Sequence, residues 1–301
     1  MPLKSQLHVN QLLSNVSVQY KNSEYIWDKL FPQVTVKKDT DYYRVYDRNF
    51  RVPETARAPK ALAREFGFEF SLSTYALEQH ALKDYVGVDE VENNDQGSLE
   101  VDTTESLTDA IYRRMELAAA NLFTTTNWSL NVSLAAGAPW SSNTITTDPI
   151  PVFDTGATSI INASGKTPNF VVLPRDGYVA MKNHVSVLDR VKYTSDKVTE
   201  AMLAGLIGVP QLLVPTAVQD TNAEGLAVST TPFFQDFAFM GWKPSSPGLR
   251  TPSVGYTFLN STPRVRSWFD QERNATAIEV EVKFTHKVVA SLCGYMIKNT
   301  V

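Results

Sequence analysis

The sequence has little that would support chemistry on a small molecule. One cysteine, Cys293, stands among 301 residues, so an intramolecular disulfide is excluded. The four histidines are scattered and lack the spacing that metal ligands show. A glycine-rich phosphate loop, a GxSxG nucleophile elbow and an HExxH helix are all missing. These absences predict a protein that is not an enzyme and that needs neither a metal nor a cofactor.

Long apolar runs and an excess of basic charge are missing as well. No stretch approaches the roughly 20 apolar residues of a membrane span, and residues 1–10 lack the apolar centre of a signal peptide. The formal net charge is −4, which gives no support for strong general binding to nucleic acid. What is present is ample core material, since 43% of the residues are hydrophobic and 11% are aromatic. We therefore expect a folded chain without a membrane-bound part.

The most informative segment consists of two predicted strands, 41–51 and 66–75. In the second strand, large apolar side chains alternate with small or polar ones: Phe66, Phe68, Phe70 and Leu72. Between the strands, Pro53 and Pro59 argue against a helix and favour an irregular tip. An isolated hairpin is marginal in water, so its apolar face needs another surface to lie on. That surface is either the core of the same chain or a neighbouring copy.

Two neighbouring regions carry opposite charge. The hairpin region bears the basic residues Arg44, Arg48, Arg51, Arg57, Lys60 and Arg64. The acidic segment that follows includes Asp89, Glu90, Glu92, Asp95, Glu105 and Asp109. These twelve residues are candidates for contacts between subunits, where they would guide encounter and register more than they would add affinity. A solvated acidic loop is the alternative that the residues leave open.

The strongest helical pattern covers residues 103–124. Its apolar stripe has helical spacing: Leu107, Ile111, Met115, Ala118 and Leu122. Asp102 is the expected N-cap, with Glu105 completing a capping box, and Asp109 is placed to pair with Arg113 one turn later. A helix of this length extends about 30 Å, enough to form the backbone of a domain.

The remaining sequence predicts a mixed α+β fold. Residues 125–168 indicate loops and short strands, whereas strands at 170–173 and 211–214 enclose two helices in an α/β subdomain. The clearest strand has Ile278, Val280, Val282 and Phe284 on one face. A further apolar strand at 292–297 has to return beside central elements, which argues against two domains joined end to end.

The order of these parts resembles the major capsid proteins of tailed bacteriophages, which share the Hong Kong 97-type capsid fold. Short segments also resemble that family: Lys29-Leu30-Phe31-Pro32-Gln33-Val34, Ser73-Thr74-Tyr75-Ala76-Leu77-Glu78, Phe170-Val171-Val172-Leu173-Pro174, Leu188-Asp189-Arg190-Val191-Lys192-Tyr193 and Leu206-Ile207-Gly208-Val209. The resemblance covers nearly the whole chain. Each segment alone is a weak signal, and the resemblance is specific because the segments occur together in this order.

The resemblance implies a division of the chain into four parts. They are an N-terminal arm at 1–37, an extended hairpin loop at 38–76, a peripheral domain at 77–168 and 261–290, and an axial α/β domain at 169–260 and 291–301. The helix at 103–124 would be the spine helix of the peripheral domain, which would also hold a long β-sheet.

The implied function is self-assembly of hexamers and pentamers into an icosahedral shell that encloses the phage genome. The implied partners are further copies of the chain, a portal protein, a separate scaffolding protein, a decoration protein and non-specifically packaged DNA. The implied location is the virion, with assembly in the host bacterial cytoplasm. Some relatives crosslink a loop lysine to a neighbouring asparagine. Lys60 lies near the hairpin tip, but the sequence identifies no base or partner for that reaction.

Two other functions stay open at this point. One is an encapsulin-like compartment shell, which would hold a protein cargo in place of DNA. The other is a soluble enzyme that uses a pair of the acidic carboxylates, as glycosidases do. The material inside purified particles distinguishes a compartment shell from a phage capsid. The size of the particle in sedimentation distinguishes a soluble enzyme from either shell.

Overall fold

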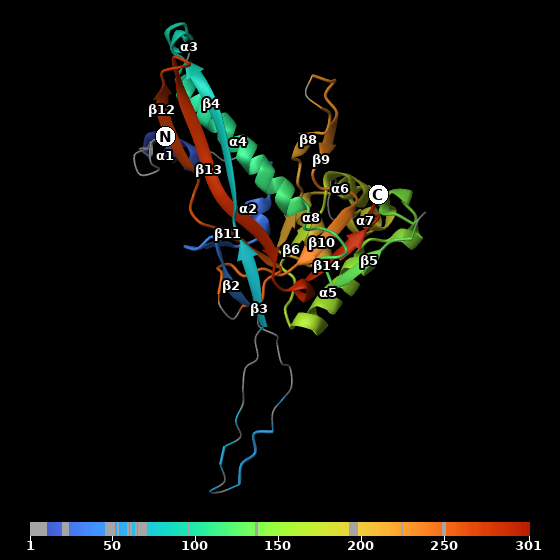
Figure 1. The fold of residues 1–301 in the computed structure, drawn as a ribbon. Coiled ribbons are helices and arrows are strands. Elements are labelled where there is room, and N and C mark those ends of the chain that lie inside the picture. The colour runs from blue at the N-terminus through green and yellow to red at the C-terminus, as the bar shows by residue number, and fades with distance from the viewer. Residues whose placement is uncertain are drawn as a thin grey trace.

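The computed structural model describes residues 11–19, 24–45, 52, 54–58, 60, 62–63, 65, 71–95, 97–135, 138–192, 198–223, 225–248 and 251–301. Within these ranges the chain forms two five-stranded sheets and two short hairpins, with helices packed on the sheets (Figure 1). The first sheet and a long helix make an elongated body, and the second sheet lies beside one end of it.

The first sheet is built around β13 (Ala275–Val288), a strand of 14 residues. Its neighbours are β4 (Glu78–Gly87) on one side and β11 (Gly255–Leu259) followed by β12 (Arg264–Asp270) on the other. Phe284 pairs with residues of both β4 and β11, which places those strands on opposite sides of β13. The alternation predicted for residues 278–285 is confirmed, because Ile278, Val280, Val282 and Phe284 are all buried.

Helix α4 (Leu99–Ala120) lies along the buried face of this sheet (Figure 1). The predicted pairing of Asp109 with Arg113 is confirmed at 2.8 Å. The predicted N-cap at Asp102 is wrong, since the helix begins at Leu99 and places Asp102 inside its first turn. Leu99 and Val101 pack against the core and draw that turn into the helix. A carboxylate in the first turn still faces the positive end of the helix dipole.

The N-terminal segment docks on the same helix and sheet. It contains α1 (Gln11–Gln19), α2 (Trp27–Leu30) and β1 (Gln33–Thr35), which pairs in parallel with β11. The Ser17 hydroxyl lies 2.8 Å from the hydroxyl of Thr108 on α4. The Ser14 hydroxyl accepts the backbone N–H of Val265 on β12 at 3.1 Å. These contacts hold the beginning of the chain against the first sheet.

The second sheet brings together strands from distant parts of the sequence. In spatial order they are β5 (Leu130–Ser133), β14 (Gly294–Lys298), β10 (Phe237–Gly241), β6 (Phe170–Val172) and β7 (Gln211–Leu213). The predicted strands at 170–173, 211–214 and 292–297 correspond to three of them. The helices that cover it are α5 (Ile150–Ser164), α6 (Arg175–Lys182), α7 (Val185–Val191) and α8 (Glu200–Ile207).

Helix α5 lies in a region where only loops and short strands were expected. Its sequence is rich in Thr, Ser and β-branched residues, which lower helix propensity. Ile150, Phe153 and Ile160 nevertheless share a face and are buried against the second sheet. Burial of that face therefore outweighs the weak local preference.

The pairing of strands differs from the expected domain division at two places. Strand β5 and helix α5 fall within 77–168, yet they join the second sheet, because β5 pairs in parallel with β14 and α5 packs on β14. Strand β11 falls within 169–260, yet it joins the first sheet through β13. The reason is that the chain passes between the sheets more often than its order of elements reveals. The other domain boundaries stay a prediction.

Two antiparallel hairpins complete the fold. The first pairs β2 (Thr40–Val45) with β3 (Ser71–Ala76), and the second pairs β8 (Val218–Asp220) with β9 (Thr230–Pro232). Phe66, Phe68 and Phe70, on which the predicted strand depended, lie outside the described residues. Short helices in the described part of the chain are α3 (Val88–Glu92) and the 3₁₀ turns Trp140–Ser142, Ile145–Thr147 and Ser291–Cys293. In the described ranges, no helix has the length and hydrophobicity that crossing a membrane requires.

Candidate assembly surfaces

The described basic and acidic candidates lie toward opposite ends of the first sheet. The β2–β3 hairpin adjoins the start of β4, whereas α3 follows directly after its end (Figure 1). A strand of ten residues spans roughly 33 Å. The hairpin and the acidic segment of one chain are thus held apart by the strand that connects them. A contact between the hairpin and the acidic segment would therefore have to join two copies of the chain.

Most of the acidic candidates are exposed on α3 and around the start of α4. Asp89, Glu90, Glu92, Asp95 and Glu105 all lie at the surface. Glu90 also accepts the backbone N–H of Gly87 at 2.9 Å, so it has a local role in starting α3. The remaining four present carboxylates to solvent.

Asp109 differs from the other acidic candidates because it is engaged within its own chain. Its side chain is only 17% exposed, and it accepts hydrogen bonds from Arg113 at 2.8 Å and from the Tyr25 hydroxyl at 3.0 Å. Burial raises the pKa of Tyr25 above its ordinary value. Asp109 therefore ties the N-terminal segment to α4, a role that its place in an acidic run did not indicate.

The basic candidates are described only in part. Arg57 and Lys60 are exposed, and Arg44 lies in β2. Arg48, Arg51 and Arg64 lie outside the described residues. Close to Arg57 and Lys60 in the sequence, Val52 is 94% exposed and Leu62 is 96% exposed. Two large apolar side chains thus face water at the hairpin tip, and burying them elsewhere would be favourable.

The root of the hairpin is anchored on its own chain. Tyr75 stacks on Phe258 with ring centroids 4.6 Å apart, and Tyr43 packs on the same ring. Beside them lies an open apolar groove of about 630 Å³ that Val34, Tyr256 and Pro252 also line. The hairpin is therefore fixed at its base, while the described part of its tip stands clear of the core.

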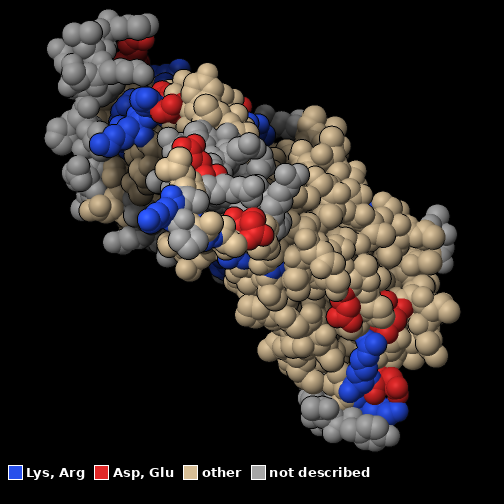
Figure 2. All heavy atoms as spheres, turned by 90° about the horizontal axis from the view of Figure 1, so that it is seen from below, with Lys and Arg blue, Asp and Glu red and all other residues tan. Residues whose placement is uncertain are grey.

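The outer face of the first sheet carries charges that pair across strands. Arg266 on β12 lies 3.6 Å from Glu279 and 3.1 Å from Glu281, both on β13. Lys283 lies 2.6 Å from Asp39. In the view of Figure 2, Lys and Arg side chains likewise lie in small groups near Asp and Glu rather than in one broad basic field.

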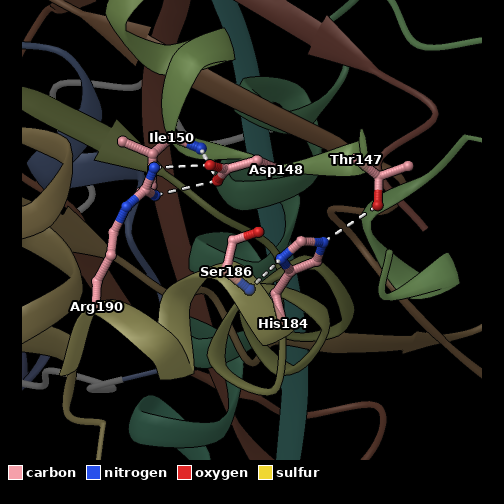
Figure 3. A network of polar contacts seen from close by, with 6 residues as sticks. All are labelled: Thr147, Asp148, Ile150, His184, Ser186 and Arg190. Carbon is pink, nitrogen blue, oxygen red and sulfur yellow. Dashed lines mark hydrogen bonds and ion pairs between the residues drawn. The ribbon is translucent and has the colours of Figure 1, made fainter. Parts of the chain in front are cut away.

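A polar network joins the start of α5 to α7 (Figure 3). Arg190 donates two hydrogen bonds to the Asp148 carboxylate, at 3.1 and 2.7 Å. His184 caps α7 by accepting the Ser186 N–H at 3.2 Å, and its other ring nitrogen lies 3.1 Å from the Thr147 hydroxyl. Burial lowers the pKa of His184. These contacts hold the loop before α5 against the loop between α6 and α7.

Chemistry-bearing side chains do not converge elsewhere in the described ranges. No three His, Cys, Asp or Glu side chains gather there as ligands for a metal ion. His80 lies 3.7 Å from the largely exposed Glu78, and in the described part of the chain this pair is not joined by a third His, Cys, Asp or Glu as a metal site. Cys293 is a buried cysteine.

Glu116 on α4 is a buried carboxyl group that the sequence pattern did not reveal. It has no exposed surface and accepts the backbone N–H groups of Ile26 at 3.1 Å and Trp27 at 2.8 Å. Burial raises its pKa to about 7, although the two N–H groups act in the opposite direction. Glu116 lies next to the buried residues Met115 and Ala119 on α4. The buried face of this helix is therefore wider than the stripe of apolar residues that the sequence shows.

The chain is similar to proteins from phages and to a phage-related bacterial protein. No family model matches the sequence. The major capsid protein of Burkholderia phage BcepMu is 26% identical over 220 residues, which cover 70% of this chain and 69% of that protein. The crystal structure of a phage-related protein from Bordetella bronchiseptica RB50 matches with a TM-score of 0.81 and 24% identity, covering 98% of each chain. The capsid structure of cyanophage P-SCSP1u matches with a TM-score of 0.60 and 9% identity, covering 89% of this chain and 85% of the other.

This chain has a phage capsid fold. The predicted α+β class is confirmed, and the phage capsid neighbours are consistent with the predicted Hong Kong 97 type. The resemblance to tailed-phage major capsid proteins inferred from the order of parts is confirmed too. In this capsid fold, β13 and α4 form the long body, and the β2–β3 hairpin leaves that body at the end far from α3 (Figure 1). The candidate surfaces thus lie at the two extremities of one subunit.

Proposed function

We infer that this chain is a major capsid protein whose copies assemble into the shell of a tailed phage. The observation that carries this conclusion is the similarity, over most of the chain, to a protein named as a major capsid protein. The capsid fold supports the same function. The role is structural and the chain belongs in the virion, where each copy contributes contacts to several neighbours and closed symmetry removes loose edges.

The finer partners follow from the same proposal. Copies would form hexamers and pentamers, and the shell would join a portal protein and enclose DNA without reading its sequence. A separate scaffolding protein would guide assembly in the host bacterial cytoplasm, and a decoration protein would bind the finished shell. The small mixed groups of charge support enclosure of DNA rather than tight binding to it.

Sedimentation and electron microscopy of the purified full-length chain test the main proposal. We expect megadalton, closed particles, whereas a small oligomer under all assembly conditions would contradict a shell protein. Particles filled with a protein cargo in place of DNA would favour an encapsulin-like compartment. A small oligomer that hydrolyses glycosides would favour the enzyme alternative, which needs a rigid pair of carboxylates.

We also propose that the hairpin of one copy meets the acidic end of another. Their separation in one chain and their opposite charge support the pairing. Charge reversal at Arg57 and Lys60 to Glu should slow assembly at low salt, and adding Asp89→Lys and Glu92→Lys should restore it. Asp89 and Glu92 suit this test because Glu90 caps α3 and Asp109 binds Tyr25. Failure of the second pair to restore assembly would reject this pairing but leave the shell function untouched.

A further inference from the structure

Strand β4 forms an exposed border of the first sheet. It lies beside β13 along the elongated body (Figure 1) and pairs with it in an unbroken register over all ten of its residues. Among the described residues, β4 pairs with no other strand. Glu78, Gln79 and residues 81–84 are exposed. A long, regular and exposed border of this kind is a template on which another strand can pair.

Hydrogen bonds near the end of β4 show which backbone groups point away from the sheet. The N–H of Val88 bonds to the carbonyl of Asn274, which precedes β13, at 3.3 Å. The N–H of Tyr85 bonds instead to the carboxylate of its neighbour Asp84 at 2.8 Å, and that of Gly87 bonds to a side chain of α3 at 2.9 Å. Even-numbered residues thus direct their backbone groups toward β13, and odd-numbered residues direct theirs outward.

The middle of this border has no partner. Backbone groups alternate in direction along a strand, so those of Gln79, Ala81 and Lys83 point outward together with those of Tyr85 and Gly87. Within the described part of the chain, no backbone group bonds to these first three residues on that side. The outward side of residues 79–87, here called the open edge, can therefore accept a further strand.

The open edge continues the line of a ladder that already exists. β2 pairs with β3, and this ladder ends where the N–H of Leu77 bonds to the carbonyl of Asp39 at 2.8 Å. Leu77 is odd-numbered and links β3 directly to β4, so β2 lies on the same side as the open edge. The unfilled part of this line is about as long as β4 itself.

The opposite border of the first sheet is covered within the chain. The Ser14 hydroxyl on α1 accepts the N–H of Val265 in β12 at 3.1 Å and donates to its carbonyl at 3.4 Å. Helix α1 thereby protects that border from further pairing. Among the described residues, no side chain covers the backbone of Ala81 or Lys83 in the same way.

We propose that two copies of this chain join through their open edges, with the two β4 strands antiparallel and a two-fold axis at Leu82. The first sheets of the two copies would then form one continuous sheet, through the same surface on both copies. On pairing, the N–H of Tyr85 would pass from Asp84 to the carbonyl of Gln79 in the other copy. The contact does not rest on the proposed function, since two copies can pair in this way without a shell.

Charge and packing along β4 favour this register. His80 of each copy comes to lie opposite Asp84 of the other, where the carboxylate can accept a hydrogen bond from the ring. The Leu82 side chains, each 41% exposed in the single subunit, meet on the axis. An axis one residue earlier would place Glu78 opposite Asp84. An axis one residue later would place Lys83 opposite itself, and like charges in those positions are destabilising.

Disulfide trapping in the full-length chain tests the contact. Leu82→Cys places two thiols opposite each other in a pair without mutual hydrogen bonds, where Cα atoms lie about 4.5 Å apart, within reach of a disulfide. Ile161→Cys on α5 is the matched control, because Ile161 is 43% exposed, and native Cys293 is only 1% exposed. Under mild oxidation at micromolar protein, the covalent dimer should form at least about tenfold faster from Leu82→Cys than from the control. Equal rates would overturn the proposal.

Mixing two further variants tests the register. His80→Cys and Asp84→Cys should form a covalent dimer when they are mixed, and neither should do so faster than Ile161→Cys when it is oxidised alone. A mixture that does not exceed the control would overturn the proposed pairing, as would rapid dimers from either variant alone. Sedimentation of the same samples reports shell formation separately.

A proline on the open edge provides an independent check. Ala81→Pro removes an N–H that points outward, so the chain should stay folded by circular dichroism. The same change should reduce the crosslinking of Leu82→Cys to the rate of the Ile161→Cys control. Unchanged crosslinking in a folded Ala81→Pro, Leu82→Cys chain would overturn the proposal. If the proline unfolds the chain, the mixing experiment decides.

Discussion

Tyr295 on β14 lies directly against Gly156 in the middle of α5, so closely that a Cβ atom at Gly156 would come within 2.7 Å of the ring carbon Cδ1. We predict that Gly156→Ala lowers the free energy of unfolding by about 1–3 kcal/mol, because the ring or the helix has to shift. Gly205 in α8 is the matched control, since nothing lies within 4 Å of its Cβ position. Gly205→Ala should raise stability by about 0.5–1 kcal/mol. Urea unfolding of both variants measures this, and equal effects would show that the contact with Tyr295 is not tight.

The hydrogen bond from Tyr25 to Asp109 should contribute measurably to the attachment of the N-terminal segment. Tyr25→Phe removes the hydroxyl that donates to Asp109 at 3.0 Å. We expect a loss of about 1 kcal/mol in unfolding free energy, since the carboxylate keeps Arg113 as a partner. Tyr42→Phe is the control, because Tyr42 is 66% exposed and its change should stay within about 0.5 kcal/mol. A loss no larger than that of the control would mean that this bond adds nothing.

His286 should make the subunit less stable in acid. Its ring accepts or donates a bond to Thr257 at 2.8 Å, and burial lowers its pKa from 6.5 to about 4. A lowered pKa gives stability that is complete above pH 6.5 and is lost as the pH falls through 4, about 3 kcal/mol in all. We expect His286→Gln to remove that part of the pH dependence when unfolding is followed from pH 7 to pH 4. Glu116 is present in both proteins and cancels in the difference. The same slope in the variant would show that His286 does not charge on unfolding.

The hairpin tip should be needed for assembly but not for folding. Deletion of residues 51–64 should leave a folded, soluble subunit that fails to form shells, because the described tip side chains Val52 and Leu62 make little contact with their own core. A Gly/Ser replacement of equal length shows whether the side chains or the length of the hairpin matter. Sedimentation measures assembly, and circular dichroism measures folding. Normal shells from the deleted chain would remove the hairpin from the mechanism.

Much of the fold could be predicted from local patterns. The strict alternation around Val280 identified β13, and the apolar stripe around Ile111 identified α4, because both elements bury apolar side chains at the regular spacing of a strand or a helix. The order of elements then indicated the capsid fold. Helix boundaries were less certain, as at Leu99, since packing of the first turn decided where the helix begins.

What could not be predicted depends on contacts between distant residues. Glu116 was not among the sequence candidates, and only the backbone N–H groups of Ile26 and Trp27, about 90 residues earlier in the chain, make it a buried acceptor. Asp109 looked like part of an acidic patch until Tyr25 was placed beside it. Helix α5 was missed because its apolar face is completed by strands such as β14, far along the chain. The charged candidates at the hairpin and at α3 remain predictions, because their partners would be other molecules.

Strand β14 separates β5 from β10 in the second sheet, although it comes from residues 294–298. A nascent chain on the ribosome therefore cannot close this sheet until Lys298 has emerged, even though β5, β6 and β10 were made long before. Domains generally fold as units during synthesis. A chain that ends before residue 294 would lack the strand that joins β5 to β10, so its second sheet would be left in two parts.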